Sequence, residues 1–226
     1  MIAGRESYGV QSAHTIWDVR AGVGAALHSP RHRLLGWRDD RLRNRVTAPG
    51  SRRLALARPQ PRCDRGSHAL TWRCAGDTDI WQRTGVAPSR HEAQALLVDI
   101  GDGDFAMQAT FDAQLAARYD QVGLLVEAGQ SSWLKAGIEL DGELWLSSVH
   151  TQGASDWARQ RWSGLPVTLR IERRAATTDV SVLEAAGAWL RVRELRLPEA
   201  VRVGPYACAP TGTGFQAQMT AASLIG

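Results

Sequence analysis

The stretch SWLKAGIELDGELWLSSVH, from Ser132 to His150, decides the fold. Apolar residues occupy every second position of its first half, which is the period of a strand with one face in a core. Asp141-Gly142 then interrupts the run, and glycine accepts the positive φ that a tight hairpin turn demands. Alternation resumes after the turn. The stretch therefore predicts two antiparallel strands, 132–140 and 144–150, joined by a hairpin.

The same short alternating runs, bounded by turn residues, recur about every ten positions from residue 69 onward. This spacing is typical of all-β proteins, and an antiparallel sandwich of two sheets is the simplest way to bury one face of each strand. The further strands predicted from this pattern are Ala69–Ala75, Ala95–Asp99, Asp104–Gln114, Gln121–Glu127, Val167–Arg173, Thr178–Leu183, Trp189–Leu195, Val201–Ala207 and Gly214–Leu224.

Residues 1–50 have a different character from the rest of the chain. They show no sustained period of 3.6 or 2, and prolines and glycines interrupt any element that begins there, apart from a short helix at Asp39–Val46. Residues 1–74 carry 14 arginines against 5 acids, although the net charge of the whole chain is only +4. We therefore predict an irregular or disordered basic extension over 1–50 and one domain over 51–226.

Composition excludes several classes of protein. No apolar run approaches the roughly 18 residues of a membrane span, and the N-terminus has no apolar core of a secretory signal. The three cysteines are odd in number and far apart, which argues against a disulfide framework or a zinc site. We therefore expect a cytoplasmic protein with no membrane partner, bound metal or cofactor.

The basic extension also argues against a nucleic-acid partner. Of the 27 basic residues, 26 are arginine and Lys135 is the single lysine. Arms that bind DNA or RNA usually mix the two residues and interleave them with stacking aromatic side chains. This bias is more typical of a GC-rich genome than of selection for phosphate contacts.

Five separated blocks of the chain resemble one known family. The blocks are TDIWQRT (78–84), YDQVGLLVE (119–127), WLKAGIELDG (133–142), SSVHTQGASDW (147–157) and VGPYACAPTGTGF (203–215). In order and spacing they resemble the DUF1349 family of concanavalin A-like domains, which often carries the label "regulation of enolase". The resemblance extends from Leu70 to Leu224 and implies a jelly-roll sandwich with one concave sheet. It also implies that a glycan could bind on that concave face, as is common in the superfamily.

Alternation assigns the first strand of the hairpin two different faces. Leu134, Ala136 and Ile138 belong to the core face, whereas Lys135 and Glu139 share the other face with Trp133. Sugar recognition needs flat apolar rings for the sugar face and polar groups for its hydroxyls. The predicted ligand-binding residues, expected on neighbouring strands of one sheet and on the loop beside it, are Gln121, Trp133, Lys135, Glu139 and Arg170, with Asp156 and Trp157 in the loop.

The same residues allow a purely structural interpretation, in which Lys135 and Glu139 satisfy each other and Asp156 forms a turn. Four further tryptophans are expected to serve in packing instead of ligand binding, namely Trp72, Trp81, Trp145 and Trp189.

Two features suggest other chemistry. Glu139, Asp141 and Glu143 form the E-x-D-x-E pattern of retaining glucanases, which requires an unbroken strand, whereas the predicted hairpin would turn Glu143 away. The two acids of Gly101–Asp104 are better explained by a turn than by a calcium site.

We therefore predict a non-catalytic domain that binds a carbohydrate or another small polar ligand, with no catalytic residue assigned. The alternatives are a glycoside hydrolase-like enzyme that uses Glu139 with another acid, and a protein-interaction module that regulates metabolism. An enzyme predicts two converging carboxyl groups, one with a raised pKa, whereas a binder predicts an exposed tryptophan beside polar groups. An interaction module predicts a flat apolar patch.

Overall fold

A computed structural model describes residues 32–33, 63–66, 69–83, 89–197 and 200–225. The regular elements within these ranges are all strands. The described residues therefore contain no helix that could cross a membrane. The predicted helix at 39–46 lies outside the described residues. So does nearly all of the predicted extension, of which only the two-residue strand β1 (His32–Arg33) is described, paired with the end of the last strand.

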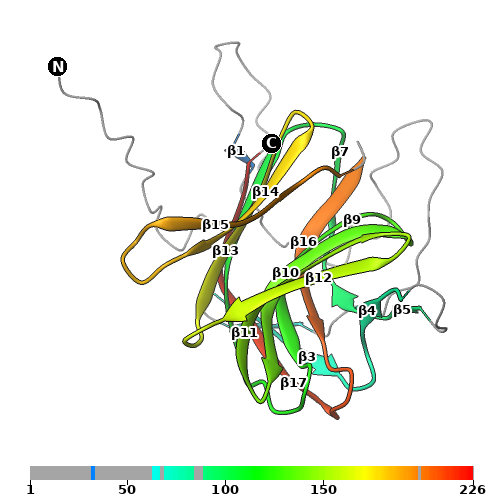
Figure 1. Cartoon of the computed structure of the whole chain (residues 1–226). Coiled ribbons are helices and arrows are strands. Elements are labelled where there is room, and N and C mark those ends of the chain that lie inside the picture. Colours follow the sequence, from blue (N-terminus) through cyan, green and yellow to red (C-terminus); the bar gives the residue numbers. More distant parts are fainter. Residues whose placement is uncertain (1–31, 34–62, 67–68, 84–88, 198–199, 226) are drawn as a thin grey trace.

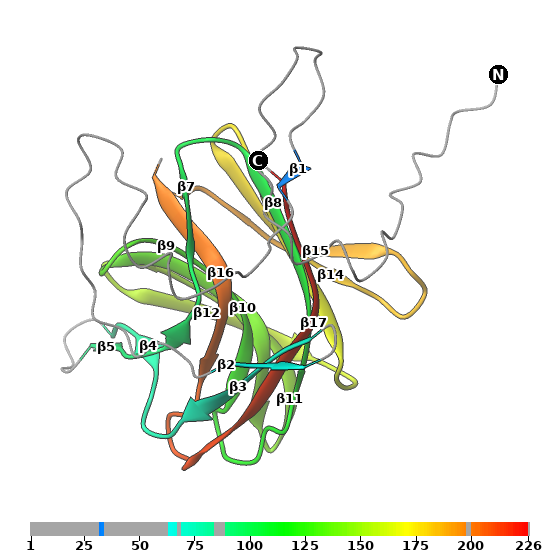
Figure 2. The ribbon, with the colours of Figure 1, turned by 180° about the vertical axis from the view of Figure 1, so that it is seen from behind.

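Two antiparallel sheets form the two layers of a sandwich (Figures 1 and 2). The first, called the β8 sheet, has the order β15-β14-β13-β8-β17-β3-β2. Its strands are β2 (Cys63–Gly66), β3 (Ala69–Ala75), β8 (Phe105–Ala113), β13 (Val167–Arg174), β14 (Thr177–Leu183), β15 (Trp189–Leu195) and β17 (Gly214–Ile225).

The second sheet, called the β10 sheet, has the order β12-β11-β10-β9-β16-β6, and β7 also pairs with β16. Its strands are β6 (Gln94–Ala95), β7 (Val98–Gly101), β9 (Gln121–Gly129), β10 (Ser132–Asp141), β11 (Glu143–Gln152), β12 (Ser155–Arg161) and β16 (Val201–Cys208). The prediction of an all-β sandwich of two antiparallel sheets is thus confirmed.

The predicted hairpin is the centre of the β10 sheet. Gly142 has a φ of 74° between β10 and β11, and Asp141 pairs with Glu143 across the turn. Leu134 and Ile138 are fully buried in the main core between the sheets, together with Phe111 of β8. The core face of β10 therefore follows the predicted alternation.

The strand prediction missed or joined a few elements. Asp156 and Trp157 were expected in a loop but lie in β12, Ser155–Arg161. The prediction missed this strand because all but its first residue are exposed and it lacks the apolar alternation that marks a strand. The single strand expected at Ala95–Asp99 is two short strands, β6 and β7, which both pair with β16.

A separate chain segment covers part of the outer face of the β10 sheet. It contains the small hairpin of β4 (Ile80–Trp81) and β5 (Arg90–His91), which both views place beside the β10 sheet (Figures 1 and 2). Fully buried Ile80 packs there against Trp133 and Leu125 in a second apolar cluster, distinct from the main core. We call residues 78–83 and 89–93 the covering segment.

Candidate functional site

The strand register arranges the outer face of the β10 sheet in rows that cross the strands. Antiparallel cross-strand partners point to the same face, so each row can be followed from strand to strand. One row joins Trp145 of β11, Glu139 of β10 and Gln121 of β9. A parallel row joins Trp157 of β12, Val149 of β11 and Lys135 of β10. Gln121, Lys135, Glu139 and Trp157 therefore lie on one face.

A row of small residues, here called the glycine row, runs between these two rows. It begins at Arg159 of β12 and passes through Ser147, Gly137 and Gly123 to Tyr206 of β16. The Tyr206 hydroxyl donates to Gln121 Oε1 at 3.4 Å. On β9, β10 and β11, the part of this row beside Lys135 and Glu139 therefore has no side chain larger than that of serine.

Lys135 and Glu139 lie on the outer face as predicted, but beneath the covering segment. Their exposed fractions are 3% and 4%. Lys135 Nζ forms its ion pair with Asp79 Oδ1 of the covering segment at 3.5 Å. Lys135, which was expected to contact a ligand, is therefore shielded from solvent, because Asp79, remote in sequence, closes over it.

Trp133 is not a platform for a ligand. It lies on the predicted face, but it is fully buried in the second apolar cluster with Ile80 above it, and Lys135 Nζ lies 5.9 Å from its ring centre. Its indole N–H is buried with no hydrogen-bond partner among the described residues. The covering segment thus converts a predicted binding residue into a packing residue.

Burial raises the pKa of Glu139, although Lys135 and a hydrogen bond with Ser147 act in the opposite direction. The folded protein therefore holds a proton on Glu139 at a pH where the unfolded chain has released it. Such a group lowers stability progressively as pH rises from about 4.5, the ordinary value, through the raised pKa.

We therefore expect Glu139→Gln, which is neutral at every pH, to be more stable than the wild type at pH 7. The difference should vanish near pH 4, where the wild-type carboxyl is protonated in both states. Urea denaturation at pH 4, 5, 6 and 7 measures it, with the exposed Glu143→Gln as the control. A Glu139→Gln protein less stable than the wild type at pH 7 would contradict the direction of the pKa shift.

The accessible part of this face is built from two tryptophans and an arginine. The Arg159 guanidinium carbon lies 4.3 Å from the Trp145 ring centre and 4.6 Å from that of Trp157. Arg159 also donates to Asp141 Oδ2 at 2.7 Å, and Arg118 donates to Asp141 Oδ1 at the same distance. These hydrogen bonds hold the pKa of Asp141 below its usual range.

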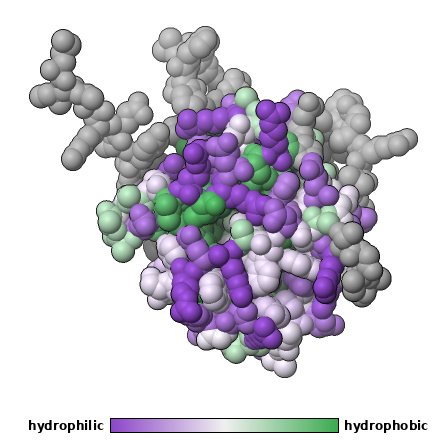
Figure 3. Space-filling model, viewed as in Figure 1, coloured by the Kyte–Doolittle hydropathy of each residue, from purple (hydrophilic) through white to green (hydrophobic). Residues whose placement is uncertain are grey.

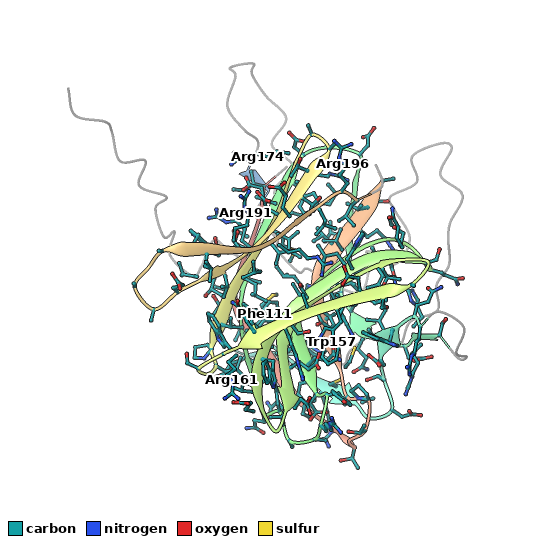
Figure 4. The ribbon with its side chains drawn as sticks, viewed as in Figure 1. Phe111, Trp157, Arg161, Arg174, Arg191 and Arg196 are labelled. Carbon is teal, nitrogen blue, oxygen red and sulfur yellow. The ribbon has the colours of Figure 1, made fainter. Side chains whose placement is uncertain are left out.

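Trp157 is 38% exposed. Its ring makes a T-shaped contact with the Trp81 ring, with 6.0 Å between the ring centres and 85° between the ring planes. Figure 4 shows Trp157 and Arg161 beside β12, while Phe111 lies between the sheets. The side of the molecule that β12 crosses is mainly hydrophilic, with small apolar patches (Figure 3). Trp145 was expected to serve in packing, and the strand register places it beside Glu139.

Arg170 is not part of this face. It was expected in the same sheet as Lys135, but it lies on β13 of the β8 sheet, opposite Gln108. Its guanidinium carbon stacks 4.2 Å from the Trp189 ring centre. Since β13 pairs with β8, and not with a strand of the β10 sheet, the sandwich core separates Arg170 from the other predicted residues.

Asp156 is also misplaced in the prediction. It lies within β12 as the cross-strand partner of His150, so it points to the opposite face from Trp157. There it pairs with Arg193 of the other sheet at 2.6 Å, and Arg193 also donates to the Ser148 carbonyl oxygen. Burial is the main cause of a lowered pKa of His150, and the positive charge of the nearby Arg193 lowers this pKa further. Asp156 therefore joins the edges of the two sheets instead of forming a rim.

The two other motifs have structural explanations. Glu143 lies on β11 beyond the turn and pairs with Arg161 at 2.7 Å, so the E-x-D-x-E pattern does not form one carboxylate row. In the turn at 101–104, Arg173 donates to the carbonyl oxygens of Gly101 and Gly103. The described residues contain no cluster of three or more potential metal ligands.

Comparison with known proteins agrees with this architecture. A curated protein of Saccharomyces cerevisiae, Regulation of enolase protein 1, is 33% identical over 152 residues, which are 65% of this chain and 76% of that protein. A crystal structure of a functionally unknown protein from Saccharomyces cerevisiae superposes with a TM-score of 0.68 and 30% identity. That match covers 74% of this chain and 92% of the other.

A more distant structure shows the fold alone. Xylan beta-1,4-xylosidase from Bacillus halodurans gives a TM-score of 0.57 at 13% identity over 70% of this chain and 33% of that one. The sequence pattern of the protein family of unknown function DUF1349 matches residues 56–225, which include every strand of the two sheets except β1. The chain belongs to the DUF1349 family.

Proposed function

We propose that this protein is a non-catalytic domain that binds a carbohydrate or carbohydrate-like ligand on the outer face of its β10 sheet. One observation carries the proposal: Trp145 and the half-exposed Trp157 stand on the two rows that also hold Glu139 and Lys135. Tryptophan faces suit the apolar face of a sugar ring, and carboxyl, amide and hydroxyl groups suit its hydroxyls.

The distribution of polar groups supports a binding role. Gln121, Glu139 and Ser147 are 4–6% exposed; Ser147 belongs to the glycine row, and Gln121 and Glu139 stand on the row beside it. Buried polar groups cost free energy unless they are hydrogen-bonded, so proteins retain them mainly where they are satisfied or used. The name of the yeast relative describes a regulator, and a binding domain suits that role.

The flat apolar patch expected of an interaction module has less support. Among the described residues, the large hydrophobic side chains that are clearly exposed are Trp157 and Leu190, which lie in different sheets. Two isolated side chains do not make a patch.

Glycan-array binding followed by titration calorimetry tests the proposal. We expect Trp157→Ala to weaken binding about 10-fold or more, because a central tryptophan commonly contributes over 1 kcal/mol. Trp189→Ala is the matched control, since Trp189 also stacks on an arginine but lies in the other sheet. The proposal is wrong if the wild type binds no glycan, or if both variants weaken binding equally.

One observation favours hydrolysis as a second candidate function. Asp79 forms an ion pair with Lys135. Burial raises the pKa of Glu139; the charge of Lys135 lowers this pKa, and the charge of Asp79 raises it. Glycosidases use one protonated and one ionised carboxyl group. Release of nitrophenol from aryl glycosides, abolished in Glu139→Gln and retained in Glu143→Gln, would favour this function over simple binding.

A further inference from the structure

The side chain of Arg159 lies against both tryptophans of the outer face, Trp145 on β11 and Trp157 on β12. Cross-strand pairing sets Trp157 beside Val149, Arg159 beside Ser147, and Trp145 one row further along. Trp157 and Trp145 therefore flank Arg159 from opposite directions along the strands, and the guanidinium lies within 4.6 Å of both ring centres.

Contacts other than Arg159 fix both rings. The Trp145 indole N–H donates to the Asp141 carbonyl oxygen at 3.3 Å, and that of Trp157 donates to Ser147 Oγ at 2.8 Å. Trp81 adds an edge contact to Trp157. The two indole rings therefore keep their places when the arginine leaves.

Arg159 is the more replaceable member of the group. Its side chain is 32% exposed, and its ion pair with Asp141 is at the surface, where such pairs contribute little. Asp141 keeps its second partner, Arg118, when Arg159 moves. A ligand that offers a flat face to the indoles and a hydroxyl to Asp141 Oδ2 replaces the two ring contacts and the hydrogen bond of Arg159.

The groups behind Arg159 suit the same ligand. Ser147 is the next residue of the glycine row, and Glu139 is the cross-strand neighbour of Trp145. A sugar ring between the tryptophans would thus have a hydroxyl and a carboxyl group on its inner side and Asp141 on its outer side. Both kinds of group bind sugar hydroxyls.

We propose that Trp145 and Trp157 form the subsite for one sugar ring, that Arg159 occupies this subsite in the free protein, and that the ligand displaces it. This inference rests on the proposed function and deepens it, because it names the ring platform and the side chain that competes for it. Arg159 is then a specificity-determining residue that admits only ligands able to replace its contacts.

The test compares Arg159→Ala with Arg161→Ala. Arg161 is a matched control on the same strand and face, 5.5 Å from the Trp145 ring centre and paired with Glu143. We expect Arg159→Ala to bind the glycans of the wild type about 3- to 10-fold more tightly, whereas Arg161→Ala stays within about twofold. Adding Trp145→Ala to Arg159→Ala should remove the gain. Thermal unfolding checks that each variant is folded.

Acrylamide quenching of tryptophan fluorescence gives a readout without any glycan. The fluorescence of Arg159→Ala should be quenched more strongly than that of Arg161→Ala. Equal quenching of the two variants would show that Arg159 does not occupy the subsite. If the wild type binds a glycan but Arg159→Ala binds it equally or more weakly, the subsite is wrong and the proposed function stands. If neither protein binds any glycan, the proposed function fails and the sugar subsite fails with it.

Discussion

Replacing Trp133 with alanine will destabilise the protein by about 3–5 kcal/mol, the usual cost of removing a large aromatic side chain from a packed interior. Trp133 is fully buried, and Ile80, Leu125 and Val149 of the second apolar cluster surround it. Because strand residues of β9, β10 and β11 form one wall of this cluster, the rigid sheet cannot collapse into the space that the indole leaves.

Urea denaturation of Trp133→Ala and Trp157→Ala side by side measures this effect. Trp157 is 38% exposed, so we expect its removal to cost about 1 kcal/mol, near the average for point substitutions. Trp133→Phe should lose less than Trp133→Ala, since it keeps most of the volume and removes the unpaired indole N–H. Equal stability of the two alanine variants would show that the covering segment does not pack on Trp133.

This difference decides which tryptophan can test ligand binding. A binding defect in Trp133→Ala would follow from loss of the covering segment as readily as from loss of a contact. Trp157→Ala removes no buried member of the second apolar cluster, although it removes a ring contact with Trp81, which packs against that cluster. The exposed tryptophan on β12 is therefore the informative position.

Alternation along the chain was enough to predict the β10–β11 hairpin and the face that carries Lys135 and Glu139. Both depend on neighbours in sequence, since side chains alternate across a strand and Gly142 supplies the turn. The same signal could not place Arg170. Its strand pairs with β8, about 60 residues earlier, and alternation does not specify which of two sheets receives a strand.

The remaining errors have a similar origin. Asp156 and Trp157 are adjacent, so in a strand they must point to opposite faces, whereas a predicted loop leaves their directions open. The covering segment brings Asp79 to Lys135, which is 56 positions later in the chain. Only the pairing of distant strands, and the segments that fold over them, could correct these predictions.

Gly137→Ala is the second substitution for which we expect a large loss, about 3 kcal/mol or more, because an added methyl group would meet a rigid backbone. A Cβ at Gly137 would approach the Val122 carbonyl oxygen to 2.2 Å, and its cross-strand partner Gly123 is as tightly restricted by the Ala136 carbonyl oxygen. Those atoms belong to the central β9–β10 ladder, so they cannot move without breaking sheet hydrogen bonds.

Gly129→Ala is the control for Gly137→Ala, since Gly129 ends β9, the strand that pairs with β10 beside Gly137, and a Cβ at Gly129 meets nothing within 4 Å. We expect its stability to stay within about 0.5 kcal/mol of the wild type. If Gly137→Ala proves equally mild, β9 and β10 can move apart at this point. The glycine row would then be adjustable, and its small residues would require a different explanation, such as the close approach of a ligand. A large loss at Gly137 alone instead means that the close approach of the β9 and β10 backbones is what requires glycine between Glu139 and Lys135.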